Sequence, residues 1–135
     1  MKPKFSTLND FAKGFITCAL WLCDESPGSG EWGKVHDFYQ RLTAKSVKRA
    51  LDLCAKFQQD NAELLAAYCA QIPPVADYSA DERAGHDLFL TSAGHGAGFW
   101  DRDEVAEDIR DALSDAARKI GETYVTRYKG RIYMQ

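Results

Sequence analysis

Hydrophobic side chains in the first half of this 135-residue chain recur every three or four positions, the spacing of a helix that buries one face. The first stripe predicts a helix over Leu8–Cys23, with Thr7 as its N-cap. A second stretch, Thr43–Ile72, begins at another N-cap residue and keeps the same period, with a polar run at 58–61 that can divide it. Pro73-Pro74 ends this stretch, because proline cannot continue a helix.

Between these two stretches the pattern breaks. Residues 24–34 are rich in Pro, Gly and Ser and predict a loop, and residues 35–42 predict a short helix or turn. Trp32 is the unusual member of the loop, because a tryptophan there either closes the edge of the core or contacts a partner.

The second half of the chain carries shorter patterns. Ser79 and Glu82 have the spacing of a capping box and predict one or two helical turns. Leu88–Thr91 predicts a short strand, and the glycine-rich segment Gly94–Gly98 predicts a tight turn after it.

The chain closes with a helix and a hairpin. Asp101 is the expected N-cap of the last helix, and Gly121 is its expected end. Residues 122–134 alternate in polarity and predict a hairpin that turns at Lys129-Gly130. These elements predict one α+β domain over residues 1–135, mostly helical with three to four helices, and a small antiparallel sheet from the strand at 88–91 and the hairpin.

Composition narrows the functional classes. The net charge is −3, from 17 basic and 20 acidic residues, which disfavours non-specific coating of nucleic acid but leaves a local basic patch open. The most apolar run, residues 15–23, is far shorter than the roughly 20 residues of a membrane span, so no membrane contact is expected. The four cysteines fall in apolar helical stretches and are expected to be reduced core thiols in the cytoplasm.

Unusual chemistry concentrates between residues 85 and 102, where two of the three histidines and three alternating glycines occur. Histidine beside carboxylate suits proton transfer or zinc binding, although the spacing matches no standard zinc ligand set, and no metal or cofactor is expected. The candidate catalytic residues are His86, Asp87, His95 and Asp101.

Two other interpretations of the same segment stay open. A strand, a glycine turn and a helix N-terminus in that order suit anion binding, although the acidic residues at the start of the last helix oppose it. In a purely structural interpretation, Phe99 and Trp100 anchor the turn in the core. Asp101 and Arg102 then act as a helix cap and as partners in a charge pair, and the two histidines form hydrogen bonds to backbone groups.

The tail gives a separate patch in which basic and aromatic residues interleave. Such a surface can bind single-stranded nucleic acid, but alternation on any exposed strand also produces a solvated face of this kind. The candidate nucleic-acid contacts are Arg127, Tyr128, Lys129 and Arg131.

The segment 85–102 resembles a motif of a family of small tailed-bacteriophage proteins, in which Gly-His-Asp leads through Leu-Thr to Gly-His-Gly-Ala-Gly-Phe-Trp-Asp-Arg. The resemblance is specific over these residues and thin over the first 80. It implies a phage origin and expression inside a bacterium, and it supplies no mechanism. The matching stretches are Gly85-His86-Asp87, Leu90-Thr91, Gly94 through Arg102, and Ile132-Tyr133 in the tail.

Because small phage proteins often bind and block host machinery, the first functional hypothesis is a non-enzymatic protein that binds a bacterial host protein or complex, such as a defence system. A small-ligand or metal-dependent enzyme built on the candidate catalytic residues is the second, and nucleic-acid binding by the tail is the third. Aromatic and arginine side chains commonly carry interface energy. The candidate binding residues are Trp32, Gly94, His95, Gly96, Gly98, Phe99, Trp100 and Arg102.

Overall fold

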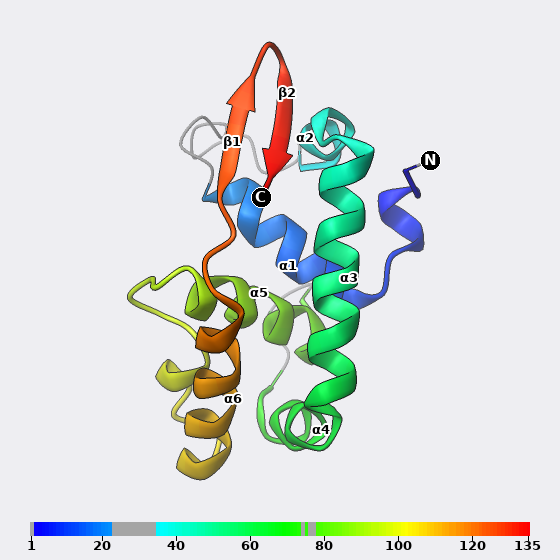
Figure 1. Ribbon diagram of the computed structural model, residues 1–135. Helices are drawn as coiled ribbons and strands as arrows, with labels where there is room; N and C mark the ends of the chain where they lie inside the picture. Colours follow the sequence, from blue (N-terminus) through cyan, green and yellow to red (C-terminus); the bar gives the residue numbers. More distant parts are fainter. Residues whose placement is uncertain (1, 23–34, 74, 76–77) are drawn as a thin grey trace.

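The computed structural model describes residues 2–22, 35–73, 75 and 78–135, so Trp32 lies outside the described residues. This part is mostly helical and ends in a two-stranded antiparallel sheet, which confirms the α+β class (Figure 1). None of its helices combines the length and apolar character needed to cross a membrane. The elements are η1 (Phe5–Thr7), α1 (Asp10–Trp21), α2 (Val35–Arg41), α3 (Ala44–Asp60), α4 (Ala62–Gln71), α5 (Ala80–Ser92), η3 (Phe99–Asp101), α6 (Glu107–Ile120), β1 (Val125–Tyr128) and β2 (Arg131–Met134).

Capping side chains fix where the helices begin. As the sequence predicts, Thr43 caps α3, and Ser79 forms a capping box with Glu82 at the start of α5. The cap of α1 is Asn9 and not the predicted Thr7, which belongs to η1. The described part holds six α-helices, more than the three to four predicted, partly because the long stretch divides at the end of α3.

The prediction of a strand at 88–91 is wrong, because these residues lie inside α5. The capping box starts a helix, and the buried residues Ala84, Leu88 and Thr91 then follow at spacings of four and three, which place them on one helical face. The sheet therefore contains only the hairpin, with no third strand among the described residues.

The end of the chain needs one correction and confirms two predictions. Asp101 lies in η3 and does not cap the last helix, because α6 begins after Ala106. Gly121 ends α6 with a φ of 84°, a conformation that glycine adopts without strain. Lys129 and Gly130 turn the hairpin with φ values of 50° and 78°, as a type I′ turn requires.

Helices α1 and α5 cross at the centre of the molecule with their backbones in contact (Figure 1). A Cβ atom on Gly85 would lie 2.0 Å from the carbonyl oxygen of Phe11, and one on Gly14 would lie 2.1 Å from that of Glu82. The two glycines therefore permit a crossing that larger residues would force apart.

Aromatic rings join the other elements to this crossing. Phe57 of α3 stacks between Phe11 of α1 and Phe99 of η3, with ring centroids 6.1 Å apart on both sides. Tyr68 of α4 meets Phe99 edge to face at 5.4 Å. Because offset and edge-to-face pairs are favourable arrangements of buried rings, η3 is held in the core.

Two of the described cysteines belong to the core. Cys18 and Cys54 are buried and form no disulfide. Burial raises the pKa of Cys18 to about 12 and raises that of Cys54 as well. Both side chains are therefore protonated thiols of low reactivity at neutral pH.

Gly85→Ala tests the α1–α5 crossing. We expect it to lower the free energy of unfolding by about 3 kcal/mol, because the added methyl group meets a backbone carbonyl that cannot rotate away. Gly96→Ala is the control, since nothing lies within 4 Å of its added Cβ, and it should change stability by less than about 0.5 kcal/mol. Urea denaturation measures both, and equal effects would contradict the crossing.

Candidate functional site

Asp87 places a carboxylate inside the protein with no exposed surface. The Tyr68 hydroxyl donates a hydrogen bond to its Oδ2 at 2.5 Å. The Arg102 guanidinium donates from Nε to Oδ2 at 3.0 Å and from Nη2 to Oδ1 at 2.5 Å. A buried carboxylate needs such partners, and this one ties α4, α5 and the segment after η3 together.

The surroundings keep these donors protonated. Burial, together with the nearby charge and hydrogen bond of Asp87, raises the pKa of Tyr68 far above its ordinary value. The hydrogen bond to Asp87 raises the pKa of Arg102, although partial burial opposes it. The phenol and the guanidinium therefore remain donors to the carboxylate across the physiological pH range.

The glycine-rich segment folds back onto α5 through a second contact. The Phe99 N–H donates to the Thr91 hydroxyl oxygen at 3.0 Å. A Cβ on Gly98 would lie 2.2 Å from that same oxygen, so the close approach requires glycine. The segment is thus fixed to α5 at Thr91 and at Asp87, one helical turn apart.

His86, next to Asp87 in sequence, faces a different environment. Its ring meets the ring of Tyr78 edge to face, with centroids 5.3 Å apart. Its Nε2 atom is buried and has no hydrogen-bond partner within the described residues. Burial lowers the pKa of His86; the charge of Asp87 opposes this shift and that of Arg102 adds to it. The imidazole is therefore neutral at neutral pH.

A cavity of about 500 Å³ lies beside His86, and we call it the His86 cavity. Three large apolar side chains on its lining are well exposed, at 49% for Trp21, 51% for Val75 and 37% for Tyr78. Cavities of this size that mix apolar walls with a few polar groups are typical binding sites. The described residues that line it are Trp21, Val75, Tyr78, Arg83, His86, Leu90 and Arg102.

Two guanidinium groups on the cavity lining are held in place from within the protein. Nη1 of Arg83 donates to the carbonyl oxygen of Pro73 at 2.6 Å, and Arg102 is held by Asp87. Each guanidinium has five N–H donors, so both keep further donors for a bound group. The cavity thus combines an apolar rim, a neutral imidazole, the positive charge of Arg83 and the guanidinium of Arg102, whose charge Asp87 balances.

The four candidate catalytic residues do not meet in one cluster. Asp87 faces Tyr68 and Arg102, whereas His86 lines the cavity. His95 and Asp101 are exposed, and neither is among the described residues that line the cavity. No three His, Cys, Asp or Glu residues in the described part lie close enough together to hold a metal ion.

The candidate binding residues divide between core and surface. Phe99 and Gly98 are buried, and Arg102 is mostly occupied by Asp87, so these three hold the fold. Gly94 and Gly96 are exposed in the turn, where a Cβ on either would meet nothing, and the backbone N–H of His95 donates to the Leu90 carbonyl. Trp100, expected as an anchor in the structural interpretation, is 39% exposed.

Sequence reasoning missed most of the His86 cavity. Its residues come from the end of α1, from residues 75 and 78, from α5 and from the segment after η3, and no local motif connects them. One signal was available, because Trp21 extends the apolar surface of α1 beyond a single stripe. Tyr68 lies on the helical period of Thr43–Ile72, which indicated its burial, but nothing in the sequence indicated that its hydroxyl pairs with Asp87.

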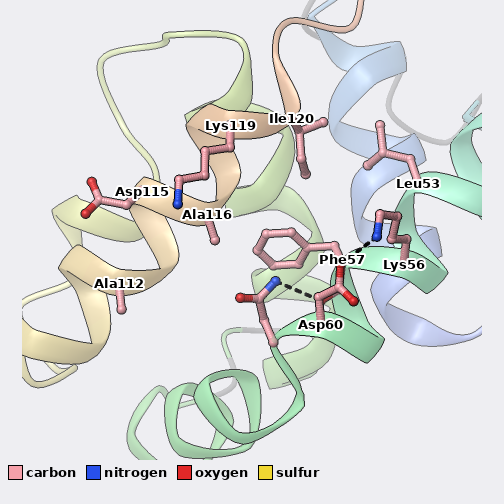
Figure 2. A pocket seen from close by; sticks show the side chains of 10 residues that line it. Leu53, Lys56, Phe57, Asp60, Ala112, Asp115, Ala116, Lys119 and Ile120 are labelled. Carbon is pink, nitrogen blue, oxygen red and sulfur yellow. Dashed lines mark hydrogen bonds and ion pairs between the residues drawn. The ribbon is translucent and has the colours of Figure 1, made fainter.

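Two grooves flank α3. Toward α6 the groove has a volume of about 610 Å³, and Phe57 points across it toward Ala116 (Figure 2). Its rims carry both signs of charge, with Lys56 and Asp60 on α3 and Asp115 and Lys119 on α6 (Figure 2). Toward β2 lies a larger groove of about 1040 Å³.

The predicted nucleic-acid contacts in the tail lie on the hairpin. Tyr128, Lys129 and Arg131 are exposed at and beside its turn, and the side chain of Arg127 lies outside what the structure describes. The ammonium group of Lys129 lies 5.3 Å from the centroid of the Tyr128 ring.

Comparisons of the chain with protein-family models, curated proteins and solved structures give no match. The geometry of the described residues is therefore the basis for a functional assignment.

Arg102→Ala tests the buried ion pair. We expect a loss of about 3 kcal/mol in the free energy of unfolding, because the variant leaves the Asp87 carboxylate buried without its cation. Lys56→Ala is the control, since it breaks only the exposed pair with Asp60 and should cost less than about 1 kcal/mol. Chemical denaturation compares them, and similar losses would show that Arg102 does not balance a buried charge.

The lowered pKa of His86 predicts a pH dependence of stability. In the unfolded chain this imidazole binds a proton as the pH falls below its ordinary pKa of 6.5, whereas in the folded protein it stays neutral to lower pH. The contribution of His86 to stability is therefore complete about one pH unit above 6.5 and is lost as the pH falls through that value, from about 7.5 toward 5.5.

Replacement of the imidazole checks this dependence. His86→Gln should flatten the fall in unfolding free energy over that pH interval, measured by urea denaturation at each pH. His95→Gln, which removes an exposed imidazole instead, should keep the fall. An unchanged slope in His86→Gln would contradict the assignment.

Proposed function

We propose that this chain is a small phage protein that acts by non-enzymatic binding to a protein of its bacterial host, and that the His86 cavity is the contact site. The observation that carries the proposal is the composition of the cavity rim. Tryptophan, tyrosine and arginine are the residues enriched among the side chains that dominate binding energy at protein interfaces, and Trp21, Tyr78 and Arg83 supply one of each.

The cavity chemistry indicates what the host protein presents. An apolar side chain can enter between Trp21 and Tyr78, where it covers surface that water otherwise contacts. A carboxylate beside it can accept hydrogen bonds from the remaining donors of Arg83 and Arg102. A host segment with a large apolar residue next to Asp or Glu fits both features.

The internal contacts of the guanidinium groups support binding of this kind. Arg83 is held by the Pro73 carbonyl and Arg102 by Asp87 before any partner arrives. A side chain that is already ordered loses little conformational entropy on binding, which favours affinity. Blocking of a host defence complex is one role that such a contact could serve, and the bacteriophage resemblance of residues 85–102 gives the biological setting.

Affinity capture from bacterial lysate tests the proposal. The tagged chain should retain a host protein, and Tyr78→Ala and Arg83→Glu should each reduce the amount retained at least tenfold, because each removes a rim contact. The control is Tyr124→Ala, which removes a more exposed aromatic ring from outside the cavity, at 58% against 37% for Tyr78. Quantitative mass spectrometry provides the measurement.

Two results would contradict the proposal. The first is that no protein is retained above the level of a tag-only control. The second is that the cavity variants and Tyr124→Ala retain the same proteins in the same amounts, because capture would then not depend on the His86 cavity.

A further inference from the structure

We infer that the groove between α3 and β2 binds single-stranded nucleic acid, a site separate from the His86 cavity. Four basic residues of α3, Lys45, Lys48, Arg49 and Lys56, line this groove of about 1040 Å³. From Lys45 to Lys56 they span twelve residues, or about 16 Å along the helix axis. Asp52 is the one acidic side chain among the described lining residues.

The net charge of the chain is small, but its acidic and basic residues are concentrated in different parts of the sequence. Residues 61–122 contain thirteen acidic and five basic residues, whereas residues 123–135 contain three basic residues and no acidic one. Outside residues 61–122, the net positive charge of the chain comes from α3 and the hairpin. These two elements lie side by side (Figure 1). A concentrated positive surface attracts phosphate even when the whole chain is acidic.

The basic side chains are available to a ligand. Lys45 and Arg49 form no ion pair with a described residue, and both are exposed. Lys48 pairs with Asp52 at 2.7 Å, and Lys56 pairs with Asp60 at 2.9 Å, but both pairs are solvent-exposed. Exposed pairs contribute about 1 kcal/mol or less, so a phosphate group can replace the carboxylate at little cost.

The hairpin adds aromatic rings to this charge. Ile132 and Met134 are buried against the core, so Arg131 and Tyr133 lie on the opposite, outward face of β2. Tyr128 pairs with Arg131 across the hairpin and shares this face. Tyr133 also lines the α3 groove, together with Met134 and Gln135, so the end of β2 forms one wall of the groove, and Tyr128 and Arg131 lie farther along the same hairpin.

Two hydrogen bonds donated by backbone N–H groups hold β2 against the start of α3. The Met134 N–H donates to the Ser46 hydroxyl at 2.9 Å, and the Thr43 N–H donates to the Ile132 carbonyl at 3.2 Å. The groove wall is therefore fixed by the fold and does not require a ligand to assemble.

Tyrosine rings together with a basic stripe favour single strands over other anions. Unpaired bases can stack on exposed rings while their phosphates contact Lys and Arg, whereas a duplex keeps its bases stacked on each other. An acidic polypeptide would use the charge of α3 but would gain little from the rings.

Fluorescence anisotropy with labelled 12-nucleotide oligo(dT) and oligo(U) tests the site. Both should bind at 50 mM salt, the affinity should fall linearly with the logarithm of salt concentration, and a duplex of the same length should bind more weakly. Arg49→Glu should weaken binding at least tenfold and reduce the salt slope by about one. Arg118→Glu, a charge reversal at an exposed arginine of α6 outside the groove, should leave both unchanged.

Substitutions of Tyr128 test separately how much the aromatic rings contribute to oligonucleotide binding. Tyr128→Ala should weaken binding about tenfold with an unchanged salt slope, because it removes stacking and no charge. Tyr128→Trp should restore the affinity, since a larger ring stacks at least as well.

Several outcomes would overturn the inference: no binding at 50 mM salt, equal effects of the two arginine reversals, or a duplex bound as tightly as the single strand. Competition with polyglutamate gives a further check. If polyglutamate displaces the oligonucleotide at an equal concentration of charge, the inference is overturned in favour of an acidic protein partner. Tyr78→Ala, which changes the His86 cavity, should bind the oligonucleotide as tightly as the unchanged chain. The nucleic-acid site and the proposed host-protein contact can therefore be disproved separately.

Discussion

Asp87 imposes the constraint around which the rest of the fold is arranged. A carboxylate without solvent contact is strongly unfavourable unless hydrogen-bond donors surround it, and here Tyr68 and Arg102 supply them from two other segments. An arrangement that moved α4 away from α5 would remove the Tyr68 hydrogen bond, and one that moved the segment after η3 away from α5 would leave the charge unpaired. A buried pair of this kind gains little over well-packed apolar residues, but removal of either partner is costly because it leaves the other charge buried and unpaired.

This constraint explains why segment 85–102 contains such uncommon residues. Gly85 allows α1 to contact α5, Asp87 holds Arg102, and Gly98 lets Phe99 reach Thr91 and enter the core. Most of the motif is therefore used to fold the turn back on its own helix. His86 differs from these residues, because its imidazole lines the cavity and no described group satisfies its buried nitrogen.

The arrangement gives the molecule two chemically different surfaces. The His86 cavity offers aromatic rings and two guanidinium groups fixed from within, and suits a protein segment that is apolar and acidic. The α3 groove and the hairpin offer exposed lysine, arginine and tyrosine side chains, and suit an extended polyanion. The two share no described lining residue, so one partner can bind without occupying the site of the other.

Local signals in the sequence were sufficient to determine the helical character, the caps at Thr43 and Ser79, and the Lys129-Gly130 turn, because each depends on residues only a few positions apart. They failed at 88–91, where the β-like composition predicted a strand but the helix that starts at the capping box continues through these residues. They also failed at Asp101, which lies in η3 and does not cap α6. The partners of Asp87 and the lining of the cavity lie up to 81 positions apart, between Trp21 and Arg102. Only tertiary packing decides such contacts, because hydrophobic periodicity shows which face of a helix is buried but not which helix covers it.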